Sequence, residues 1–114
     1  MRLQLRPEMK LIQDLSDRIE EENNDAEFYA EWALEVMDMY PQLANTLFKI
    51  SLEETRHMNA LHDEVVKIIN QYRADHGDPP ADMLAIYEYL HKKHIAAAGE
   101  TKALQIMFQD KVSP

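Results

Sequence analysis

The chain contains no cysteine among its 114 residues. Disulfide bonds, thiolate zinc sites, cysteine-held iron–sulfur clusters and rubredoxin-type iron centres are therefore excluded, because each needs cysteine sulfur. Glycine is almost as scarce, with 2 residues, whereas Met, Leu, Ala, Glu and Lys are frequent. This composition favours helix, and long strand-like alternation of apolar and polar residues is absent. The sequence predicts an all-α protein.

Positive charge is also in short supply: 12 Lys and Arg stand against 21 Asp and Glu, a formal net charge of -9. This balance argues against non-specific nucleic-acid binding, which needs a basic surface. No apolar run reaches membrane-spanning length, and the first residues lack the apolar core of a signal peptide. We therefore expect neither nucleic acid nor membrane as a partner. The expected location is the cytoplasm, either free or inside a compartment made by another protein.

The few prolines and glycines divide the chain into helical segments. Tyr40 precedes Pro41, and a residue before proline disfavours the helical region. Gly77 accepts the left-handed conformation that ends many helices, and Pro79 suits the first turn of the next. A single domain, 1–114, is predicted to hold three antiparallel helices, each about 45 Å long. Their expected ranges are 8–39, 41–75 and 79–111.

The second of these helices carries Glu54 and His57, a Glu-x-x-His spacing that places both side chains on one face. An apolar stripe with helical spacing runs through the same helix. It consists of Leu43, Leu47, Ile50, Leu61, Val65 and Ile68. Glu54 and His57 fall in register with this stripe, which is expected to face the core. An unpaired buried charge is very costly, so a bound cation would be one way to neutralise the pair.

The first helix has one acidic residue on its own apolar stripe, Glu22. The stripe takes in Leu11 or Ile12, Leu15, Ile19, Glu22, Ala26, Tyr29, Ala33 and Val36 with Met37. Measured from the turn at Pro41, Glu22, Glu54 and His57 lie at depths of about 28, 20 and 24 Å. We expect the three groups to meet across the hairpin. Carboxylate oxygen together with imidazole nitrogen suits iron, manganese or zinc.

One chain supplies only half of a paired-metal site. Di-iron carboxylate bundles use a Glu from each of two helices and a Glu-x-x-His from each of two more. The third helix offers a second Glu-x-x-His, Glu88 and His91, but Glu88 aligns with Lys92 and Gly99 rather than with the core, so we interpret it as surface. A homodimer would complete the set and a four-helix bundle. One Glu pair would then bridge two metals, and each His57 would bind one.

Residues 22–57 resemble the ferritin-like superfamily, and within it the encapsulated ferritins and rubrerythrins. Glu22 is followed seven residues later by Tyr29, and the stretch YPQLANTLFKISLEETRH ends in the Glu-x-x-His. The resemblance implies half a ferritin bundle per chain, with two iron ions at the interface between subunits and Mn or Zn as other metals. It also implies ferroxidase activity, in which Glu22, Glu54 and His57 oxidise ferrous iron. Tyr29 would be a hydrogen-bonding group beside the ligands, and an encapsulating shell protein a further partner.

Other interpretations remain open at the level of sequence. A rubrerythrin-like peroxidase would need an external electron donor, since the chain has no cysteine. A metal-free helical interaction module would pair the three groups with cations from a partner. Glu21 could replace Glu22 in another register, but its helical neighbours are polar, which favours Glu22. His62 is interpreted as flanking the stripe and His94 as a histidine at the edge of the core.

Overall fold

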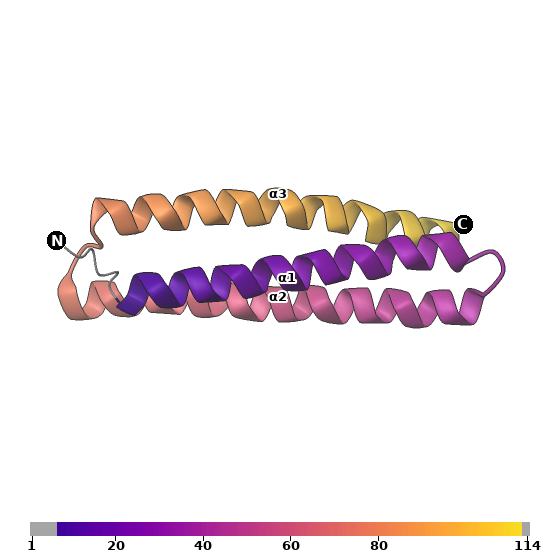
Figure 1. The fold of residues 1–114 in the computed structure, drawn as a ribbon, viewed down its shortest axis with the longest axis horizontal. Coiled ribbons are helices and arrows are strands. Elements are labelled where there is room, and N and C mark those ends of the chain that lie inside the picture. Colours follow the sequence, from indigo (N-terminus) through magenta and orange to yellow (C-terminus); the bar gives the residue numbers. More distant parts are fainter. Residues whose placement is uncertain (1–6, 113–114) are drawn as a thin grey trace.

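The computed structural model describes residues 7–112, which form three helices: α1 (Pro7–Val36), α2 (Pro41–His76) and α3 (Ala81–Val112). Figure 1 shows them running side by side along the length of the molecule, with α1 and α2 closely paired and α3 along the opposite edge. No strand occurs among these residues, which confirms the all-α prediction. The molecule is elongated, with extents of 59 × 27 × 18 Å. None of the three described helices is long and apolar enough to cross a membrane.

The first joint follows from the proline at its end. Tyr40 has φ −133° and ψ 68°, outside the helical region, as expected for a residue before proline. The Tyr40 N–H donates to the Val36 carbonyl at 2.7 Å, and the Tyr40 carbonyl accepts from Ala44 N–H at 2.9 Å. The chain therefore turns without leaving these backbone groups unpaired. α1 ends at Val36, three residues before the predicted boundary.

The second joint combines a glycine with two prolines. Gly77 has φ 86° and ψ −158°, and its N–H donates to the Arg73 carbonyl. Residues with a side chain essentially avoid this region of backbone conformation. α3 begins at Ala81, two residues later than predicted. Pro79 is itself followed by a proline, so it disfavours the helical region. The first helical hydrogen bond of α3 runs from Leu84 N–H to the Pro80 carbonyl.

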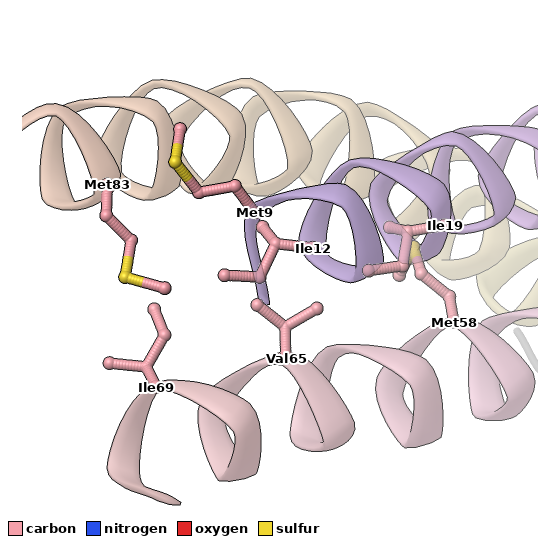
Figure 2. Packing of buried hydrophobic residues seen from close by; sticks show 7 residues of the cluster. All are labelled: Met9, Ile12, Ile19, Met58, Val65, Ile69 and Met83. Atoms are coloured by element: carbon pink, nitrogen blue, oxygen red, sulfur yellow. The ribbon is translucent and has the colours of Figure 1, made fainter. Parts of the chain in front are cut away.

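Two apolar clusters form the core. The larger lies where α2 ends and α3 begins, and Figure 2 shows side chains from all three helices converging there. It consists of Met9, Ile12, Ile19, Met58, Val65, Ile69 and Met83. The smaller lies near the first joint and consists of Ala33, Ala44, Leu47 and Phe108. The Phe108 ring stacks on Phe48 with centroids 4.6 Å apart, which fixes the C-terminal half of α3.

A polar layer joins α3 to the hairpin in the middle of the molecule. The Gln105 amide donates to Ser51 Oγ and to Thr55 Oγ1, each at 3.0 Å. The Thr101 hydroxyl donates to Asn23 Oδ1, also at 3.0 Å. All but Thr55 are buried, and hydrogen bonding removes most of the cost of that burial. These contacts place α3 on the side of α2 that carries Ser51 and Thr55.

The predicted apolar stripe of α2 is only partly buried: Leu47 and Val65 belong to the core clusters, and Leu61 and Ile68 pack against the larger one. The buried residues of α2 are Ala44, Leu47, Ser51, Met58, Val65 and Ile69. Leu43 is 43% exposed, whereas Ile50, Leu61 and Ile68 are half-buried. On α1 the stripe passes through Ile12, which is buried, and not through Leu11. α2 packs mainly on α1, and α3 contacts α1 more extensively than it contacts α2.

The side of the hairpin that faces away from Gln105 carries exposed and half-buried apolar residues, and we call it the outer flank. His57 follows Thr55 by two residues, about 200° around the helix, so it lies on the side of α2 opposite Gln105. Residues at heptad spacing from it share its face. The outer flank consists of Leu11, Leu15, Tyr29, Val36, Leu43, Ile50, Leu61 and Ile68, with Glu22, Glu54 and His57 among them.

Candidate metal centre

The structure brings Glu22, Glu54 and His57 together, as predicted. Each offers one ligand atom, and the three atoms lie within 4.8 Å of one another. His57 Nδ1 is 3.6 Å from Glu22 Oε2 and 3.8 Å from Glu54 Oε2. The heights predicted for the three residues along the hairpin agree with the structure, because α1 and α2 are regular helices that pack along their length.

Glu22 carries an unsatisfied oxygen. Its side chain is only 12% exposed, and its Oε2 is buried with no hydrogen-bond partner. The other oxygen, Oε1, accepts from Arg18 Nη2 at 3.3 Å. His57 Nδ1 lies too far from Oε2 for a good hydrogen bond. A buried acceptor without a partner costs about 1–3 kcal/mol, and more when it is charged. A cation between Glu22, Glu54 and His57 would satisfy this atom.

The pKa of Glu54 reflects the negative charge of Glu22 beside it. A hydrogen bond to Glu22, burial and repulsion from the Glu22 charge together raise the pKa of Glu54 to about 7, while His57 acts in the opposite direction. Two carboxylates this close repel each other, which favours the protonated form of Glu54. A bound cation would relieve the same repulsion.

His57 is the most solvent-exposed of the three ligand candidates. Its side chain is 60% exposed, against 20% for Glu54. The imidazole contributes a nitrogen ligand and the carboxylates contribute oxygen ligands, a set that suits iron, manganese or zinc. Three donor groups do not fill the coordination sphere of two such ions, so further ligands have to come from water or from another chain.

Two neighbouring residues considered as site components lie outside this centre. Glu21 is exposed and forms an ion pair with Arg18, so the register that includes Glu22 is the one observed. Tyr29 is half-buried, and its ring contacts Phe28 and Trp32 at centroid distances of 5.6 and 6.5 Å. Within residues 7–112 no hydrogen bond joins Tyr29 to the three ligand candidates. Its role as a hydrogen-bonding group beside the ligands stays a prediction.

A pair of histidines in contact between α2 and α3 was not predicted from the sequence. Glu88 is exposed as predicted, but the surface interpretation is wrong for His91, which is half-buried. Its Nδ1 lies 2.9 Å from His62 Nε2 on α2, and its ring stacks on Tyr87. A signal was present in the sequence. His62 follows Thr55 by seven residues and His91 precedes Gln105 by fourteen, so each shares the face that joins α2 to α3.

Comparisons of the chain with protein-family models, with curated proteins and with solved structures found no match. The ferritin-like resemblance therefore rests on the residues of the chain themselves. The functional assignment depends on the chemistry of Glu22, Glu54 and His57.

Proposed function

We propose that this protein is a half-ferritin, a homodimeric di-iron protein that binds ferrous iron and oxidises it. Glu22, Glu54 and His57 of each chain supply the ligands. The observation that carries the proposal is the buried, unpartnered Glu22 Oε2, which faces a second carboxylate and an imidazole within 4.8 Å. Uncompensated polar groups of this kind cluster at functional sites, because folding alone does not favour them.

The dimer is proposed because the outer flank is both apolar and incomplete. Leu11 and Leu43 are 51% and 43% exposed on it, and half-buried apolar side chains lie between them and the ligand candidates. A two-fold interface uses the same patch on both subunits, so it would duplicate each ligand and bury the apolar residues at once. The duplicated set, four Glu and two His, is that of the di-iron carboxylate bundles.

The three ligand residues would have different roles in binding and oxidising iron. The two carboxylates attract the ferrous substrate and stabilise the ferric product more strongly, because their negative charge interacts more with the higher cation charge. His57 supplies a neutral nitrogen ligand. Glu54, whose pKa is raised to about 7, gives up its proton when metal binds. Iron at the centre would pass one electron per ion to oxygen or peroxide.

The direct test is the metal content of protein purified anaerobically with added ferrous iron. The wild-type protein should hold about one iron per chain, two per dimer, and oxidise it when oxygen is admitted. Glu54→Ala should hold almost none and keep its helicity in circular dichroism. Glu88→Ala is the matched control, because it removes an exposed carboxylate from another Glu-x-x-His.

The outcomes separate the competing interpretations. Wild-type iron content in Glu54→Ala would overturn the assignment of the site. An iron-free wild-type protein would favour the metal-free module, in which cations from a partner pair with the three groups. Arg18 of the same chain already lies 3.3 Å from Glu22 Oε1. Faster turnover with peroxide and an added reductant than with oxygen would favour the rubrerythrin-like peroxidase.

A further inference from the structure

A second group of metal-ligating side chains lies on the other side of the hairpin from Glu22, Glu54 and His57. His62 on α2 and His91 on α3 face each other, with 2.9 Å between Nε2 and Nδ1. Both line a pocket of about 140 Å³, whose wall also includes His94 and Asn59. Liquid water occupies about 30 Å³ per molecule, so the pocket has room for an ion and a few waters.

The contact between the two rings fixes their protonation. At 2.9 Å one nitrogen must carry the hydrogen and the other must present a lone pair, so at least one imidazole is neutral. Burial lowers the pKa of both His62 and His94, and a neighbouring histidine lowers each further. Neutral imidazole is the form that binds metals.

His94 lines the same pocket, but among residues 7–112 its ring nitrogens do not group with those of His62 and His91 within 4.8 Å of one another. It is therefore a neighbour of the histidine pair and not a ligand candidate. The charged groups nearby are Glu20 and Lys93, which pair with each other at 3.4 Å, and Asp63.

We propose that His62 and His91 bind one divalent transition-metal ion of the kind that prefers imidazole, such as Zn²⁺, Co²⁺, Ni²⁺ or Cu²⁺, with water as the remaining ligands. Such an ion sits about 2.0–2.1 Å from each nitrogen, so two ligands of one ion lie about 3 Å apart, close to the observed separation. The ion would replace the shared proton. Both donors are imidazole nitrogens and neither is a carboxylate, which disfavours Mg²⁺ and Ca²⁺. The bound ion would cross-link α3 to α2.

The test uses Co²⁺, whose visible absorption reports nitrogen coordination, in a Glu54→Ala background that silences the other centre. The parent variant should bind one Co²⁺ per chain and melt at a higher temperature with the ion. Adding His91→Ala or His62→Gln should weaken Co²⁺ binding at least about tenfold. His76→Ala is the matched control, because His76 is an exposed histidine on α2 that contacts Tyr72 instead.

A direct measurement guards against variants that fail to fold. Zn²⁺ added to the Glu54→Ala protein should shift the imidazole resonances of His62 and His91 and leave those of His76 unchanged. The proposal would be overturned if the Glu54→Ala protein bound no Co²⁺. It would also be overturned if His91→Ala and His76→Ala weakened Co²⁺ binding equally, or if Zn²⁺ left the resonances of His62 and His91 unshifted. Because Glu54 is absent throughout, the result does not depend on the proposed di-iron function.

Discussion

Glu22 combines burial with a missing partner, and this conflict gives a prediction about stability. In Glu22→Gln the charge is removed, the amide oxygen can still accept from Arg18, and the amide N–H can donate to Glu54. The metal-free protein should therefore be more stable than the wild type, by about 1–2 kcal/mol. Urea unfolding of the metal-free proteins would measure the difference.

The control for this change is Glu21→Gln, which removes a neighbouring carboxylate that is 61% exposed. It should alter stability by less than about 0.5 kcal/mol, the usual range for surface substitutions. The Glu22→Gln protein should also bind iron more weakly, because the amide is a poorer ligand. A Glu22→Gln protein that is less stable than the wild type without metal would show that Glu22 is a structural carboxylate.

Glu54 predicts how the stability of the metal-free protein depends on pH. Its pKa rises from 4.5 to about 7 on folding, so between these values the folded protein holds a proton that the unfolded chain has released. The contribution of this proton is fully present below about pH 4.5 and is lost as pH rises through about 7. The wild type should lose more stability between pH 5 and 8 than Glu54→Gln does. If urea unfolding shows that the wild type and Glu54→Gln lose the same stability between pH 5 and 8, the raised pKa of Glu54 is contradicted.

At the level of the helices, the two glycines predict opposite effects of the same substitution. Gly77 closes α2 with φ 86° and ψ −158°. An alanine is strained there, so Gly77→Ala should destabilise the protein by about 1–3 kcal/mol. Gly99 lies in the interior of α3, and a methyl group there would meet nothing within 4 Å. Gly99→Ala should stabilise the protein by about 0.5–1 kcal/mol. Thermal melts of both variants, read by circular dichroism, test the two signs together.

The helices and the ligand candidates could be predicted from sequence because each depends on local rules. Pro41 and Gly77 fix the joints. A rise of about 1.5 Å per residue then fixes the height of Glu22 against Glu54. The face towards α3 could not be predicted in the same way. That face depends on where α3 begins, and the Pro79–Pro80 pair moves this start to Ala81. It also depends on which of two adjacent apolar stripes of α2 packs towards α3. The contact between His62 on α2 and His91 on α3 follows from these two choices.

Taken as a whole, the molecule is more extended than a compact domain of similar length. Its radius of gyration is 17.7 Å. A compact domain of 100 residues has a radius of about 13 Å. α3 covers one side of the hairpin, where Gln105 and Phe108 hold it in place. The outer flank has no such cover within residues 7–112, and the candidate metal centre lies in the middle of it. Assembly and metal binding should therefore favour each other.

This linkage predicts that charges on the outer flank disrupt both properties. Leu11→Lys with Leu43→Lys changes residues that are 51% and 43% exposed there, so the fold of one chain should tolerate them. A copy docked on this flank would bury the two ammonium groups without partners, at a cost of several kcal/mol. Light scattering should show the wild type as a dimer or larger, more strongly with ferrous iron, and the double variant as a monomer with little iron.

The matched control is Ile95→Lys with Ile106→Lys, in which the replaced residues are 58% and 45% exposed on α3. These positions lie away from the outer flank, so the control should assemble and bind iron as the wild type does. If both double variants stay assembled, or both fall apart, the outer flank is not the interface. A stable wild-type monomer that holds two metals per chain would refute the half-site altogether, because three ligand groups would then suffice where six were expected.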